Sequence, residues 1–117
     1  MTTTEVGRLG EDAASAFLLA EGYRIEERNA YRARGEIDIV AFDGPTLCFI
    51  EVRARSDDAF GGALASIGAA KRRHLVRAAS VLLQRYQDPP RARFDVVVVD
   101  LSTMACTLHR AAFTADG

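Results

Sequence analysis

The sequence has few cysteines, no long apolar run and no recognisable leader. These shortages argue against a zinc site, a membrane span and a signal peptide. Cys48 and Cys106 stand alone, without a CxxC or Cys/His spacing, so the chain carries no zinc motif. No apolar run approaches the roughly 20 residues needed to cross a bilayer. The first residues, MTTTEVGRLGED, lack the basic and apolar regions of a signal peptide. We therefore expect a cytoplasmic protein without a membrane association, in which both thiols stay reduced.

The length and composition predict a globular chain. Its 117 residues fit a single domain (1–117), with a tail that frays after about residue 113. Apolar residues make up 49%, charged residues 26%, and the net charge is −1. A chain of this length buries enough surface to fold without a disulfide or a metal ion.

Charge is unevenly distributed along the chain. Basic residues gather in the segment 71–93, whereas acids gather in 5–12, 36–58 and 95–116. Fourteen of the fifteen basic residues are arginines, and Lys71 is the only lysine. A basic segment facing an acidic centre suits a polyanion held at a metal site, but a solvated helix face has the same pattern.

The periodicity of apolar residues predicts an α/β fold. Expected helices span 3–21 and 69–87, and expected strands span 23–29, 35–42, 47–54 and 93–100, with a further strand at 104–110. Thr2 and Glu5 fit a capping box, Gly22 fits a helix stop, and residues 57–68 fit a loop. The order α-β-β-β-α-β indicates a mixed central sheet flanked by helices, in which the valine-rich strand 93–100 is the parallel partner.

The strongest functional signal is a pair of acids in neighbouring strands. A turn centred between Gly44 and Pro45 places Asp38 opposite Glu51, and Glu36 opposite Arg53. Alternation puts these four on one face and leaves the other face apolar. The residues of that second face are Ile37, Ile39, Ala41, Cys48, Ile50 and Val52. Facing carboxylates destabilise a sheet unless a hard divalent cation such as Mg²⁺ lies between them.

Each of these acids has a second interpretation. Asp38 and Glu51 also fit a solvated face with Arg53 and Arg55 as counter-ions, and a shift of one residue in register would separate them. Glu36 and Arg53 also fit a simple cross-strand ion pair. Glu11 fits an acid placed near the start of a helix by the helix dipole, or a third acid leaning over the sheet.

Four blocks together resemble the YraN family of bacterial proteins. They read GRLGEDAASAFLLAEGYRIEERN, RGEIDIVAFDGPTLCFIEVRARS, FGGALASIGAAKRRHLVRAA and RFDVVVV, and they run from about Gly7 to Val99. That family resembles Holliday-junction resolvases and the restriction-endonuclease-like PD-(D/E)XK nucleases. The resemblance implies a restriction-endonuclease-like fold and a metal-dependent DNA endonuclease, with branched or damaged DNA as a candidate substrate. It implies a homodimer only by analogy.

The resemblance also implies roles for single residues. Asp38 and Glu51 correspond to the two metal-binding acids for Mg²⁺ or Mn²⁺, with the backbone of Val52 and the helical acid Glu11 as further ligands. Glu36 belongs to the GEID block of the site. Arg53 stands where the nucleases place lysine. An arginine side chain does not release its proton in proteins, so general-base catalysis at this position is in question.

Three outcomes follow from that substitution. A metal-bound hydroxide suffices, Lys71 substitutes from the second helix, or the fold binds nucleic acid or a protein partner without cutting; Lys71 also fits a plain surface residue. Nucleic acid would lie over the loop and the start of the second helix. The residues expected to contact it are Arg55, Gly61, Gly62, Lys71, Arg72, Arg73 and Arg77.

Overall fold

The computed structural model of the protein describes residues 1–56 and 67–115. The elements are α1 (Thr3–Ala20), β1 (Arg24–Arg32), β2 (Gly35–Asp43), β3 (Thr46–Arg55), α2 (Ala69–Leu83), β4 (Ala92–Asp100) and β5 (Cys106–Phe113). The predicted fold class is confirmed, with β5 as the further strand. The loop expected at 57–68 falls mostly outside the described residues, and so does the end of the C-terminal tail. No helix in the part described is both long and apolar enough to span a bilayer.

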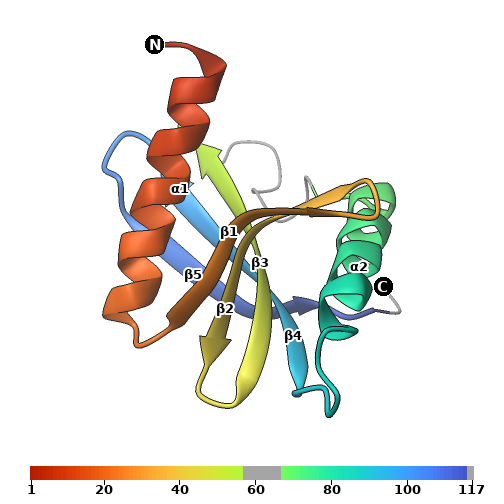
Figure 1. The fold of residues 1–117 in the computed structure, drawn as a ribbon. Helices are drawn as coiled ribbons and strands as arrows, with labels where there is room; N and C mark the ends of the chain where they lie inside the picture. The colour runs from red at the N-terminus through yellow and green to blue at the C-terminus, as the bar shows by residue number, and fades with distance from the viewer. Residues whose placement is uncertain (57–66, 116–117) are drawn as a thin grey trace.

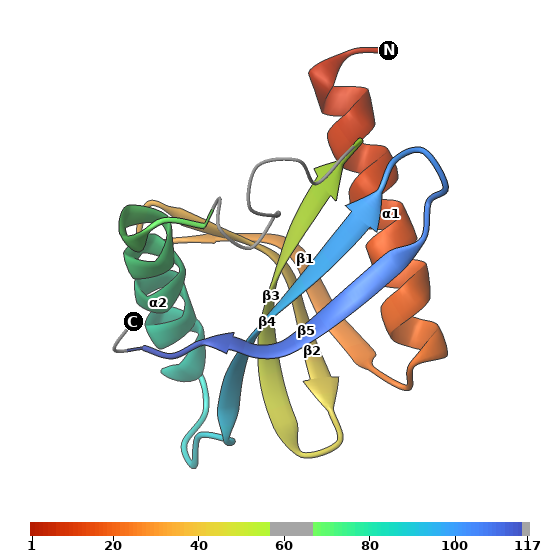
Figure 2. The same ribbon diagram turned by 180° about the vertical axis from the view of Figure 1, so that it is seen from behind.

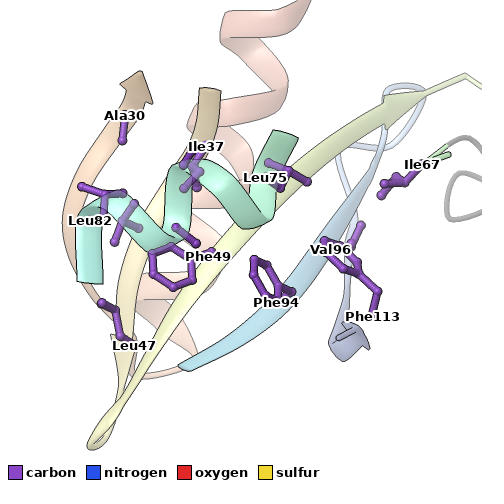
Figure 3. Close-up of a cluster of buried hydrophobic side chains, with 13 residues drawn as sticks. Ala30, Ile37, Leu47, Phe49, Ile67, Leu75, Leu82, Phe94, Val96 and Phe113 are labelled. Atoms are coloured by element: carbon purple, nitrogen blue, oxygen red, sulfur yellow. The ribbon is translucent and has the colours of Figure 1, made fainter. Parts of the chain in front are cut away.

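The strands form one mixed sheet in the order β1-β2-β3-β4-β5. β3 and β4 are parallel, as predicted for the valine-rich strand, and the other neighbours are antiparallel. The two helices lie on opposite faces of the sheet (Figures 1 and 2). α1 packs Ala14 and Leu18 on one face, and α2 packs Leu75 and Leu82 on the other. Figure 3 shows the α2 side, where the rings of Phe49 and Phe94 lie 5.7 Å apart.

The start of α1 has the predicted capping box. The Thr2 hydroxyl accepts from the Glu5 N–H at 3.1 Å, and the Glu5 carboxylate accepts from the Thr2 N–H at 3.2 Å. The helix ends before Gly22, whose φ of 93° is a left-handed conformation that glycine adopts without strain. These signals fix the helix within one residue of the expected bounds.

Three element ends differ from the prediction by three residues or more. β1 continues past Asn29 and β5 continues past Arg110; Asn29 and Ala111 adopt left-handed φ angles of 53° and 51° without ending the strand. α2 ends at Leu83 instead of Gln87. Beyond Leu83 the chain continues in tighter turns with bonds to the carbonyl three residues back.

The predicted register between β2 and β3 is confirmed where the strands pair. Asp43 lies opposite Thr46, and the ladder continues to Ile39 opposite Ile50. Beyond this pair the ladder stops. There the Val52 N–H donates to a carboxylate oxygen of Asp38 at 2.8 Å. The two strands therefore separate at the first predicted acid.

Alternation breaks at the same place, which corrects the prediction of a single apolar face. Ile37 packs in the α2-side cluster, whereas Ile39 and Ile50 pack in the α1-side cluster. At the same level in β1, the left-handed Asn29 falls between the pairs Arg28–Ile39 and Ala30–Ile37. The β1–β2 hairpin consequently bends away from the sheet and crosses to α2 (Figure 1).

A polar network inside the α1 side was not predicted. Asp95 is fully buried in the valine strand. It accepts hydrogen bonds from Tyr23 Oη at 3.0 Å, from Arg93 Nε at 2.8 Å and Nη2 at 2.9 Å, and from the Ala111 N–H at 2.9 Å. Arg93 also bonds to Asp43 at 2.8 Å. The network ties the end of α1, the β2–β3 turn and β5 to the central strand, at the opposite end of the sheet from the separation of β2 and β3.

Candidate metal and nucleic-acid site

The candidate site lies where β2 and β3 separate. Asp38 is half-buried, and its bond from the Val52 N–H fixes one oxygen against β3. Glu51 is 3% exposed. The two carboxyl groups are close enough to share a hydrogen bond. The acids that the sequence placed opposite each other therefore do approach one another, although the strands no longer pair at this point.

Burial is the main reason why the pKa of Asp38 is raised, to about 8. The hydrogen bond and the charge of Glu51 raise it further, while the Val52 N–H and the charge of Lys71 lower it. Near neutral pH the Asp38 carboxyl thus keeps its proton for much of the time. A divalent cation between the two acids would take the place of that proton.

Two cationic side chains meet Glu51. Arg53 Nη2 lies 3.2 Å from Glu51 Oε2, and Lys71 Nζ lies 3.4 Å from the same oxygen. Arg53 comes from the same strand, whereas Lys71 comes from the first turn of α2. The Lys71 side chain is 40% exposed, so it reaches the site from its open side. The sequence left Lys71 as either a substitute from the second helix or a plain surface residue, and the structure places its amine in contact with Glu51.

Glu11 approaches from α1. Gly10 makes this possible, because a Cβ there would lie 3.0 Å from the Ala54 Cβ, so the helix lies close to β3. Glu11 accepts a hydrogen bond from Asn29 Nδ2 at 2.8 Å. Burial raises the pKa of Glu11; the Asn29 hydrogen bond lowers it, and the charge of Asp38 raises it again. The carboxylate of Glu11 is thus within the electrostatic field of the acid pair but is bonded elsewhere.

Glu36 lies at the edge of the site. It is exposed, and its contact is Asn29 Nδ2 at 3.4 Å. The expected cross-strand partner, Arg53, pairs with Glu51 instead. The end of the β2–β3 ladder at Ile39 and Ile50 accounts for this difference, because Glu36 lies beyond the paired residues. Asn29, which was not among the predicted site residues, links Glu36 to Glu11; its only advance signal is that asparagine tolerates a left-handed backbone.

A cleft opens between the first turns of α1 and the end of β3. It has a volume of about 300 Å³, and its walls include Glu11, Asp38, Arg53 and Arg55. Among residues 1–56 and 67–115, no group of three or more His, Cys, Asp or Glu side chains gathers closely enough to hold a metal ion. Asp38 and Glu51 are the pair that could hold a cation, and carboxylate oxygens are ligands that suit Mg²⁺ or Mn²⁺.

The predicted nucleic-acid residues divide between two places. Arg55 lies in the cleft, and Lys71 lies at Glu51. Arg72, Arg73 and Arg77 line a separate hollow of about 440 Å³ beside the end of β5. Gly61 and Gly62 lie outside the described residues. The structure therefore does not bring all the predicted basic residues together.

Fold and site together define a mixed α/β protein with paired acids at the separation of two central strands. Residues 10–99 match the model of the Uncharacterised protein family UPF0102, and the chain belongs to this family, which confirms the resemblance to YraN proteins. A UPF0102 protein of Herminiimonas arsenicoxydans is 48% identical over 99 residues, covering 85% of this chain and 80% of its own length. One from Paracidovorax citrulli is 49% identical over 118 residues, covering 97% and 86%.

Proposed function

We propose that the protein is a metal-dependent endonuclease that hydrolyses phosphodiester bonds in DNA, branched or damaged DNA being its candidate substrate. The observation that supports this most directly is the approach of Asp38, which lines an open cleft, to the buried Glu51. Both acids come from the central strands, and Glu51 is almost wholly buried. Burial of paired carboxylates costs stability, which a bound divalent cation would offset.

Asp38 and Glu51 would hold Mg²⁺ or Mn²⁺, with the Val52 backbone as a further oxygen donor and Glu11 next to them. Such a cation would supply polarisation of a phosphoryl oxygen and a lowered pKa of a bound water. The Val52 N–H keeps the Asp38 carboxylate oriented. Burial of Glu51 restricts water at the inner side of the pair.

Arg53 and Lys71 share the role that the related nucleases give to one lysine. Arg53 offers planar paired donors to a phosphate, and it stays protonated. Lys71 presents a flexible amine at the same Glu51 oxygen from α2. In this proposal Arg53 binds and orients the phosphate, and Lys71 moves a proton or stabilises the developing charge.

The proposal is tested by cleavage of linear, flapped and four-way DNA with Mg²⁺ or Mn²⁺. We expect Asp38→Asn to abolish cleavage and Lys71→Ala to reduce it by about a hundredfold. Arg53→Lys should retain activity. Glu26→Gln, an exchange of an acid in β1 that pairs with Arg24, is the matched control and should leave the rate unchanged. Equal cleavage by wild type and Asp38→Asn would identify a contaminating enzyme and end the proposal.

A second function is favoured by one observation, the double ion pair at Glu51. Arg53 and Lys71 already neutralise this carboxylate, as expected of a nuclease fold that binds nucleic acid or a protein partner without turnover. Calorimetry with Mg²⁺ and Mn²⁺ separates the two functions. A catalytic site binds the cation in wild type and loses it in Asp38→Asn.

A further inference from the structure

The tip of the β1–β2 hairpin, residues 31–34, has features that the fold does not require. Arg32 pairs with Gly35, so Ala33 and Arg34 form a two-residue turn. Both have left-handed φ angles, 50° and 64°, in a turn type that strongly prefers Asn-Gly. Neither residue is glycine, so the turn is strained. Strain of this kind is often retained where the side chain has a function.

The side chains at the tip face solvent. Tyr31 is 63% exposed, one of the largest exposures of any large apolar side chain described. Arg34 is also exposed and has no ion-pair partner in the part of the chain that the structure describes. The tip therefore presents an aromatic ring and a free guanidinium together.

The tip is nevertheless held firmly. Ala30 and Ile37, just behind it, are fully buried against α2. At Gly35 an added Cβ would lie 2.6 Å from the carbonyl oxygen of His74, so the hairpin backbone rests directly on the helix backbone. Figure 1 shows the tip beside the first turns of α2, the turns that supply Lys71. Its position relative to the candidate site is thus fixed.

A row of contacts connects the tip to the acids. Tyr31 lies opposite Glu36 across the hairpin, and Asn29 bonds to both Glu36 and Glu11. Tyr31 is two strand residues, roughly 7 Å, from Asn29. Asn29 in turn bonds to Glu11, which lines the cleft, so a nucleic-acid strand that leaves the cleft on this side would reach the tip within a few nucleotides.

We propose that the hairpin tip binds an unpaired nucleotide adjacent to the bond presented to Asp38 and Glu51. The Tyr31 ring stacks on the base, and the Arg34 guanidinium binds a neighbouring phosphate. Bases inside a continuous duplex are already stacked and cannot reach the ring. The tip thus selects DNA with single-stranded or branched segments over plain duplex. This inference rests on the proposed function and names the substrate feature that the site reads.

Binding without metal tests the inference separately from cleavage. Labelled single-stranded, flapped and duplex oligonucleotides are titrated in EDTA and followed by fluorescence anisotropy. Tyr31→Ala should weaken binding of the first two by about ten- to a hundredfold and leave duplex binding unchanged. Arg34→Ala should weaken binding of the single-stranded and flapped oligonucleotides less than Tyr31→Ala does. Leu19→Ala, on the exposed side of α1, is the control and should have no effect.

A second measurement uses the absence of tryptophan from the sequence. Tyr31→Trp introduces a single fluorophore that single-stranded DNA should quench and duplex should not, whereas Tyr86→Trp, near the other end of α2, should respond to neither. Thermal unfolding checks that each variant folds. Unchanged binding by Tyr31→Ala, or equal loss for duplex, overturns the role of the tip. If Asp38→Asn still abolishes cleavage in that case, the proposed function stands; if no DNA binds at all, both fall.

Discussion

Replacing Asp38 with asparagine should remove a pH dependence from the stability of the metal-free protein. Burial and Glu51 raise the pKa of Asp38 from 3.8 to about 8. Between these values the folded chain keeps a proton that the unfolded chain has lost. Unfolding then releases a proton, so the free energy of unfolding falls as pH rises. The stabilisation that the Asp38 proton gives the folded chain is complete below about pH 4 and is lost as pH rises through about 8.

The size of the effect follows from the two pKa values. The slope approaches 1.4 kcal/mol per pH unit while the carboxyl is protonated only in the folded chain. Between about pH 5 and about pH 7.5 the wild type should lose about 3 kcal/mol relative to Asp38→Asn. For a domain of this size that corresponds to roughly 10 °C in Tm. The amide introduced by the substitution stays neutral, and its oxygen can still accept from the Val52 N–H.

The assay is urea unfolding of both proteins in EDTA at several pH values. The difference between the two isolates Asp38, because the lowered pKa of Asp43, caused first by its hydrogen bond from Arg93, affects both alike. Added Mg²⁺ should stabilise the wild type more at higher pH and leave the variant unchanged. Parallel pH profiles for the two proteins would refute the claim that burial and Glu51 raise the pKa of Asp38.

Two further substitutions test the packing that positions the site. Gly35→Ala should destabilise the fold by about 2 kcal/mol, because its Cβ would lie 2.6 Å from the His74 carbonyl oxygen; wild-type stability in urea would show that the hairpin does not rest on α2. Arg93→Met should cost about 3 kcal/mol by leaving the fully buried Asp95 without its cation, and Asp95→Asn in the same chain should recover part of the loss. No recovery would contradict the charge-based explanation.

The β2–β3 register was predictable because it is local. Asp43, Gly44 and Pro45 mark the turn, and the apolar residues on either side alternate regularly, so the pairing down to Ile39 and Ile50 follows. The approach of Asp38 and Glu51 follows from the same register. Helix α1 was similarly predictable from its cap and its glycine stop. In each case a few neighbouring residues determine the conformation.

What the sequence did not reveal depends on contacts between distant segments. The break in alternation coincides with the left-handed Asn29 in another strand, and the pattern within β2 gives no sign that Ile37 and Ile39 pack on opposite faces. The contact between Lys71 and Glu51 requires α2 to be docked first. The burial of Asp95 within a valine run is likewise visible only once Tyr23 and Arg93 surround it.

The separation of β2 and β3 at Asp38 relates the destabilisation caused by the buried acids to their proposed role. Asp38 accepts the Val52 N–H of β3 beyond the point where the β2–β3 ladder ends, and there the buried Glu51 contacts Lys71 of α2. An apolar residue at position 38 would relieve the buried charge, but it would also remove one of the two carboxylates that meet next to Arg53 and Lys71. The separation of the strands is therefore best understood as the structural requirement of the site, which the fold maintains at the expense of a more regular sheet.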